Sequence, residues 1–161
     1  MPLERLLAAD RIESAAQADD SDAVLDAAAR LLADDAPAQV AAVAASLRQR
    51  ERLGSTAIGH GIAIPHGRSD AFPEPRGAFL RLAHPVAFGA GDEQPVDLVF
   101  ALIVPAHFTQ QHLQLLSELA ERFADADYRD ALRHADDGSA LLRLLSQPPP
   151  PAAALRSGAR P

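Results

Sequence analysis

The chain has 161 residues, of which 48% are hydrophobic and 4% aromatic, and its formal net charge is −7. This length suits one domain with a sizeable core, and the acidic balance argues against a nucleic-acid-binding surface as the main function. The absence of cysteine excludes disulfides, zinc–thiolate sites and thiol catalysis. The N-terminus lacks a basic-then-apolar signal pattern, and no apolar run approaches the ~20 residues of a membrane span. We therefore expect a cytoplasmic protein without membrane insertion.

Hydrophobic spacing predicts helices in the first and last thirds of the chain. Apolar residues recur there every three to four positions, as on one face of a helix. Pro37 suits the first position of a helix, and Thr109 is a candidate cap with a hydrophobic staple between Phe108 and Leu113. The expected helical segments are 3–8, 23–33 with Ser21 or Asp22 as N-cap, 37–52, 109–124, 126–134 and 137–146.

The middle of the chain has the character of strands. The run 96–104 is almost continuously apolar, as expected of a strand buried on both faces, and Pro105 ends it. Helices before and after the strands predict a single α/β domain over 1–146, in which a short mixed β-sheet is flanked by helices on both sides. The Pro/Ala-rich segment 147–161 is expected to be a disordered tail. The expected strands are 56–58, 61–64, 77–83 and 96–104.

One strand leads into a histidine with unusual neighbours. Pro65 has a fixed φ and no N–H, so sheet pairing is expected to end there and to leave His66 at the strand end. Gly67 has no Cβ, which allows backbone and ligand to approach closely, and Arg68 adds a cation. An imidazole in this setting suits phosphoryl chemistry. The alternative is a histidine in an ordinary turn.

Candidate partners for this imidazole lie on both sides of it in the sequence. A neutral imidazole is a competent nucleophile towards phosphorus, and a phosphorylated ring needs hydrogen-bond donors around it. Arg50 stands out among the arginines at the end of the 37–52 helix, although cations there also complement the helix dipole. Thr56 offers a hydroxyl, or simply fills a strand.

His112 is the second histidine of interest. It begins the apolar stripe of the 109–124 helix, near a helix N-terminus that favours anions. The preceding strand ends at an edge of the sheet, where site residues gather in α/β folds. The alternative is a hydrogen-bonded histidine at the edge of the core. Metal-ligand spacings and nucleotide-binding fingerprints are absent from the sequence.

Together these residues resemble a known family. The run from Arg50 to Arg68 resembles the active segment of the fructose/mannitol-type IIA domains of the bacterial phosphotransferase system. The stretch 94–106, followed by His112, resembles the second signature of that family. The sequence from Gly54 to Gly67 is most similar to that of the nitrogen-regulatory branch, except that His60 occupies a position where asparagine is expected. That departure leaves the nucleophile intact but raises the question of a pH-dependent charge near the pocket.

The resemblance implies a mannitol-IIA-like sandwich and a role for each candidate residue. His66 would accept a phosphoryl group on Nε2 from a histidine-containing phosphocarrier protein, supplied ultimately by phosphoenolpyruvate. Arg50 would bind the phosphoryl oxygens, His112 would line the same pocket, and Thr56 would assist. Steering of the donor by Arg68 is our own interpretation. The donor arrives activated, so we expect no metal, nucleotide or other cofactor.

Two kinds of phosphocarrier and one other class of protein fit these motifs. The first is a regulatory phosphocarrier, a stoichiometric phosphotransferase whose phosphorylation state controls partner proteins. The second is a sugar-transport component that passes phosphate to a IIB domain. The lack of fused IIB or IIC sequence and the motif around His66 favour the regulatory phosphocarrier. The third, a binding module without turnover, would tolerate loss of His66.

Overall fold

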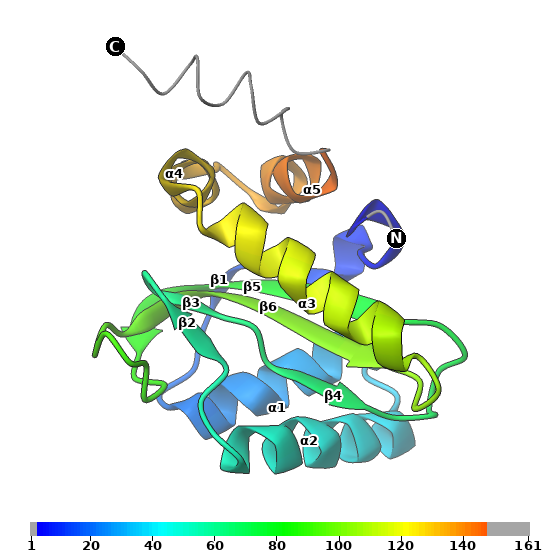
Figure 1. The fold of residues 1–161 in the computed structure, drawn as a ribbon. Coiled ribbons are helices and arrows are strands. Elements are labelled where there is room, and N and C mark those ends of the chain that lie inside the picture. The colour runs from blue at the N-terminus through cyan, green and yellow to red at the C-terminus, as the bar shows by residue number, and fades with distance from the viewer. Residues whose placement is uncertain (1–2, 148–161) are drawn as a thin grey trace.

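In a computed structural model, which describes residues 3–147, a mixed sheet lies between two layers of helices (Figure 1). The sheet order is β1-β5-β6-β3-β2, and β4 also pairs with β6. The predicted α/β domain with a mixed sheet flanked on both sides is therefore confirmed. The strands are β1 (Ile12–Ala16), β2 (Ala57–Gly59), β3 (Ile62–Ala63), β4 (His66–Arg68), β5 (Arg76–Val86) and β6 (Val96–Val104). The helices are α1 (Ser21–Leu32), α2 (Pro37–Arg52), α3 (Thr109–Phe123), α4 (Ala126–His134) and α5 (Gly138–Ser146), with short 3-10 turns at Leu3–Arg5 and Ala9–Arg11.

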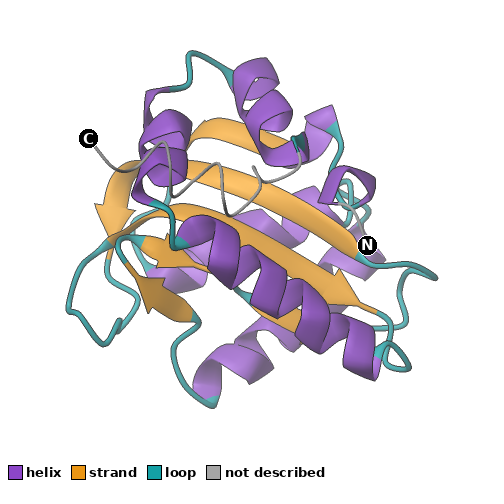
Figure 2. Ribbon diagram, turned by 45° about the horizontal axis from the view of Figure 1, so that its top comes forward, coloured by secondary structure: helices purple, strands orange, loops and turns teal. Residues whose placement is uncertain are grey.

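Strand β6 is the centre of the sheet, as its apolar sequence predicts. It pairs antiparallel with β5 and parallel with β3 and β4. Side chains alternate between the two faces of a strand, so Ala101 and Ile103 join the core beneath α1 and α2. Phe100 and Leu102 join the second core, beneath α3, α4 and α5. Figure 2 shows the sheet running between these two layers.

The expectation that sheet pairing ends at Pro65 is wrong. Ile62 pairs with Leu98 and His66 pairs with Leu102, so one register along β6 continues across the gap between β3 and β4. Pro65 removes a single donor, while its carbonyl still accepts the Leu102 N–H at 2.9 Å. His66 therefore begins a short parallel strand and does not lie beyond the end of one.

Two other strands differ from the prediction. Strand β1 was not expected, because its sequence Ile-Glu-Ser-Ala-Ala is short and largely small or polar. It becomes a strand by pairing in parallel with β5, a contact distant in sequence. Strand β5 continues through His84 and Pro85, beyond residue 83 where the strand was expected to end, with a register irregularity between Arg81 and Val86 that accommodates the proline.

Helix starts also differ in detail from the prediction. The N-cap of α1 is Asp20, whose side chain accepts the Ala23 N–H, and not Ser21 or Asp22. Helix α3 has Phe108 as N-cap without a side-chain bond, so Thr109 is its first residue and not its cap. Leu113 is 62% exposed, and the expected staple does not form.

The structure does not describe residues 1–2 and 148–161 at the two ends of the chain. The predicted tail, 147–161, lies almost wholly outside the described residues. None of the helices in the described part combines the length and apolar character that crossing a membrane requires.

Candidate functional site

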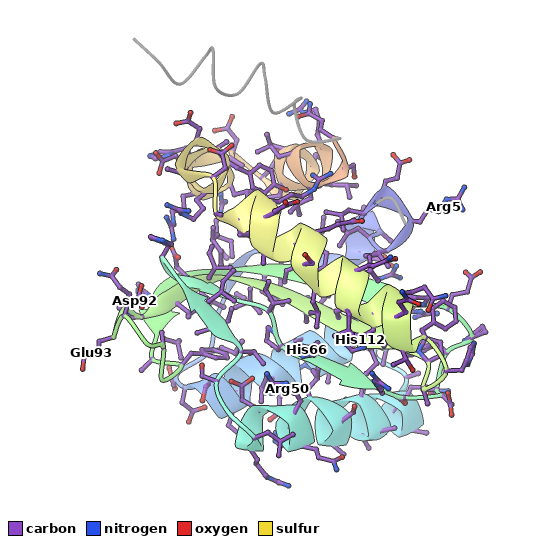
Figure 3. All side chains as sticks on the ribbon, in the orientation of Figure 1. Arg5, Arg50, His66, Asp92, Glu93 and His112 are labelled. Carbon is purple, nitrogen blue, oxygen red and sulfur yellow. The ribbon has the colours of Figure 1, made fainter. Side chains whose placement is uncertain are left out.

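The candidate site lies where β4 passes between α2 and α3 (Figure 3). Strand alternation decides which way each residue points. His66 shares the face of its partner Leu102, which belongs to the core beneath α3. Gly67 points to the opposite face, where an added Cβ would collide with Ser46 Oγ of α2. The absent side chain at Gly67 thus allows α2 to approach the strand that carries His66.

The hydrogen bonds of His66 define its tautomer. Its Nδ1 lies 2.7 Å from the Ile64 carbonyl oxygen, and Arg50 Nε–H donates to its Nε2 at 3.2 Å. A carbonyl only accepts and a guanidinium only donates. The proton is therefore on Nδ1, and the lone pair is on Nε2.

Electrostatics keep this imidazole neutral. Burial lowers the pKa of His66, and the positive charge of Arg50 lowers it further, against the opposing effects of the Ile64 carbonyl and Glu51. A lowered pKa leaves the ring unprotonated at neutral pH. The Nε2 lone pair is thus available for nucleophilic chemistry.

His112 lies beside His66, as its position in the sequence suggested. The two ring centroids are 5.3 Å apart with an interplanar angle of 80°. His112 is only 4% exposed, and its Nδ1 has no hydrogen-bond partner among the described residues. Burial is the main cause that lowers the pKa of His112 to about 4, and electrostatic interactions with His66 and Arg68 lower it further. Buried polar atoms without partners are rare in folded proteins, so an unpartnered Nδ1 argues against the alternative, a hydrogen-bonded histidine at the edge of the core.

A cavity of about 340 Å³ opens at this place. It brings together four of the five residues singled out from the sequence, Arg50, His66, Arg68 and His112. Its other lining residues are Ser46, Gln49, Leu53, Gly67, Leu113 and Leu116.

The arginines at the end of α2 have different roles. Arg48 Nε donates to Asp22 at 2.8 Å, and the same guanidinium also pairs with Asp26, so it joins α2 to α1. Arg50 turns to the cavity and to His66. These contacts separate Arg50, which the sequence analysis singled out, from Arg48.

Thr56 is not among the residues that line the cavity. It is 4% exposed, and its hydroxyl donates to Glu51 Oε1 at 2.7 Å while its N–H donates to Glu51 Oε2 at 2.9 Å. Its hydroxyl is engaged by a carboxylate, and it has no direct contact with Arg50 or His66 among the hydrogen bonds of the site.

His60 is also apart from the cavity. It occupies an exposed turn with φ of 58°, and its N–H donates to Asp92 Oδ2 at 2.9 Å. Asp92 lies at the far left of Figure 3, well separated from His66. Asparagine and histidine are among the residues that tolerate this left-handed conformation, which accounts for either residue at this position.

Sequence reasoning missed the apolar rim of the cavity. Leu53 is 82% exposed and Leu113 is 62% exposed, and both line the site. One signal of this rim was available in the sequence. Leu113 falls outside the apolar stripe of α3, which indicates an exposed leucine directly after His112. Within the described residues, no group of three or more histidine, aspartate or glutamate side chains is placed to hold a metal ion.

Comparison with known proteins identifies the family to which this chain belongs. Residues 5–147 match the sequence model of the family described as "Phosphoenolpyruvate-dependent sugar phosphotransferase system, EIIA 2". The chain belongs to this family, and the resemblance noted from its motifs is confirmed.

Individual relatives point to the nitrogen-regulatory branch. A nitrogen regulatory protein of Bradyrhizobium diazoefficiens is 37% identical over 153 residues, which cover 95% of this chain and 100% of that protein. The crystal structure of nitrogen regulatory protein IIA-Ntr from Neisseria meningitidis matches with a TM-score of 0.83 at 34% identity, over 89% of this chain and 98% of that one. Mannitol enzyme IIA of Escherichia coli, solved in complex with its phosphorylated enzyme IIB, shares the fold with a TM-score of 0.72 at 22% identity, over 86% and 96% of the two chains.

Proposed function

We propose that this protein is a regulatory phosphocarrier. It accepts a phosphoryl group on Nε2 of His66 from a phosphohistidine of a histidine-containing carrier protein, and its phosphorylation state controls partner proteins. The observation that carries the proposal is the pair of hydrogen bonds that leaves a neutral His66 with its lone pair on Nε2, beside the cavity. The relatives named nitrogen regulatory proteins support the regulatory role.

The transfer step balances without a cofactor. The Nε2 lone pair of His66 attacks phosphorus, the P–N bond of the donor breaks, and its electron pair returns to the donor imidazole. The Nδ1–H of His66 stays bonded to the Ile64 carbonyl, which stabilises the positive charge that develops on the ring.

Arg50 and His112 stabilise the transferred group. Once Nε2 carries phosphorus it no longer accepts a hydrogen bond, so the Arg50 Nε–H is released to a phosphoryl oxygen close by. His112 is neutral, and its Nδ1 is enclosed, so its Nε2–H is the donor that it offers to the phosphoryl group. Arg68, which is exposed at the rim, adds positive charge that attracts an anionic donor.

A second candidate function is sugar transport, in which the phosphoryl group passes to a IIB domain. The mannitol relative, solved with its phosphorylated IIB, motivates this alternative. A binding module without turnover is the third possibility, and it has no need of a nucleophilic lone pair at His66.

Labelling distinguishes these functions. The protein is incubated with phosphoenolpyruvate, the first phosphotransferase of the relay and the carrier protein, and acid-labile phosphate is measured. We expect stoichiometric labelling of the wild type and of His84→Ala, an exposed histidine on β5, and none of His66→Ala. Equal labelling of His66→Ala and wild type, or none of the wild type, rules out the phosphocarrier. Rapid onward transfer to an added IIB domain would replace the regulatory assignment with transport.

A further inference from the structure

We propose that Glu51 and Thr56 form a positioning pair that holds Arg50 against His66. The inference rests on the proposed function, because it concerns the same phosphoryl site. It gives a role to Thr56, which does not line the cavity, and to Glu51, which was not among the candidate residues of the sequence or the residues that line the cavity.

Two hydrogen bonds join Thr56 to Glu51. Glu51 lies in the last turn of α2, and its two carboxylate oxygens accept the N–H and the hydroxyl of Thr56 at 2.9 and 2.7 Å. Hydrogen bonds to an ionised acceptor are stronger than neutral ones, and Thr56 is 4% exposed, which shields them from water. The end of α2 is thus joined to the residue that precedes β2.

The segment enclosed by this contact touches Arg50. The Gly54 N–H donates to the Glu51 carbonyl at 3.2 Å, and the Gly54 carbonyl accepts Arg50 Nη1–H at 2.8 Å. The Nε–H of the same guanidinium donates to His66 Nε2 at 3.2 Å. Because a guanidinium is planar and rigid, fixing Nη1 on Gly54 directs Nε towards His66.

This arrangement gives the pair a role in the rate of transfer. Arginine has many rotamers, and without a fixed Gly54 carbonyl its side chain is spread over several of them. The phosphoryl oxygens would then meet Arg50 in the correct place only part of the time. A misplacement of about 1 Å lowers a rate by as much as about a hundredfold.

A double-mutant cycle tests whether Glu51 acts through Arg50. The transfer rate from the phosphorylated carrier is measured by rapid quench for wild type, Glu51→Ala, Arg50→Ala and the double variant. We expect Glu51→Ala to lower the maximal transfer rate about tenfold with little change in the carrier concentration that gives half of that rate. When Arg50 is already alanine, we expect Glu51→Ala to lower the maximal rate less than about twofold further.

Glu51→Gln is the matched control. Its amide oxygen can accept the Thr56 N–H while its amide nitrogen donates to the Thr56 hydroxyl, so the link survives without the charge. We expect it to retain most of the rate. A rate as low as that of Glu51→Ala would mean that the charge of Glu51 matters and not its positioning, and would overturn the inference.

A spectroscopic measurement separates this inference from the proposed function. In the unphosphorylated protein, we expect Glu51→Ala to shift the NMR resonances of Arg50 Nε–H and His66 Nε2, which needs no phosphoryl transfer. Unchanged resonances, or equal rate losses with and without Arg50, would refute positioning even if His66 is phosphorylated normally. If Glu51→Ala fails to fold, Thr56→Val removes only the hydroxyl, and Thr56→Ser must restore both the resonances and the rate.

Discussion

Replacing Gly67 with alanine tests how α2 is held against the strand that carries His66. The added methyl group would collide with Ser46 Oγ, and it would lie 3.1 Å from the backbone carbon of Ser46. Helix backbone cannot yield as a flexible side chain does, so either α2 or β4 must move. The hydrogen bond from Ser46 Oγ to the Arg68 carbonyl, 2.7 Å long, is lost in either case.

The expected cost follows from these two contacts. Inserting a methyl group into a packed site costs about 1–3 kcal/mol, and losing the Ser46 hydrogen bond costs about 1 kcal/mol. For a chain of this length each kcal/mol lowers Tm by about 2–4 °C. We therefore expect Gly67→Ala to lower Tm by about 4–16 °C. It also slows transfer, because α2 carries Arg50.

The assay is thermal unfolding followed by circular dichroism, with Gly91→Ala as the matched control. Gly91 has nothing within 4 Å of an added Cβ and no left-handed φ, so this variant should melt like the wild type. Ser46→Ala should partly rescue Gly67→Ala, because it removes the clashing oxygen but keeps the Ser46 Cβ. If Gly67→Ala melts like Gly91→Ala, the close approach of α2 to β4 does not exist as described.

Three further predictions concern the histidines and Arg50. Arg50→Ala should slow phosphorylation of His66 by about 10²–10³-fold with the fold intact by circular dichroism, whereas Arg52→Ala, an exposed arginine of the same helix, should leave the rate unchanged; equal losses would indicate a general charge effect. The pKa of His112 is lowered from 6.5 to about 4 in the folded chain. Between these two pH values the imidazole of His112 is therefore protonated in the unfolded chain and neutral in the folded chain. Stability should therefore fall between about pH 6.5 and 4, by up to about 3 kcal/mol, and unfolding titrations of His112→Gln should show a smaller loss in that window; an identical pH profile would contradict the assignment. His60→Asn should transfer phosphate normally at neutral pH, because both residues tolerate the left-handed turn; a large loss in a labelling assay would mean that His60 has a direct role.

Local pattern was sufficient for much of the fold. Helix α4 follows from hydrophobic spacing, and helix α2 and the buried strand β6 follow from that spacing together with Pro37 and Pro105 at their ends, because these signals lie within or beside each segment. Strand β1 could not be predicted in this way. Its five residues have little strand character, and only pairing with β5 makes them a strand. The short β4 was missed for a similar reason, since its pairing depends on the register of β6 across Pro65.

The proposed nucleophile and its proposed partners were singled out from residue types and motif order. His66, Arg50 and His112 come from three separate segments, and two family signatures in the right order linked them before any contact was known. Geometry then changed the account of Thr56, whose hydroxyl belongs to Glu51, and separated Arg50 from Arg48, which pairs with carboxylates of α1. The sequence singled out Arg50 but could not show what its neighbours bind, because arginines of one helix end have the same chemistry until other residues take up their hydrogen bonds.

The amino-acid order alone thus indicated the family of the chain and a candidate phosphoryl-accepting histidine, since both depend on residue types at short spacings. Which nitrogen of His66 carries the lone pair depended on the folded chain. That property is set by the Ile64 carbonyl on one side of the ring and the Arg50 guanidinium on the other. The carbonyl lies between β3 and β4, two residues before His66, whereas the guanidinium comes from a helix residue 16 positions earlier, and only tertiary packing brings it to the same imidazole.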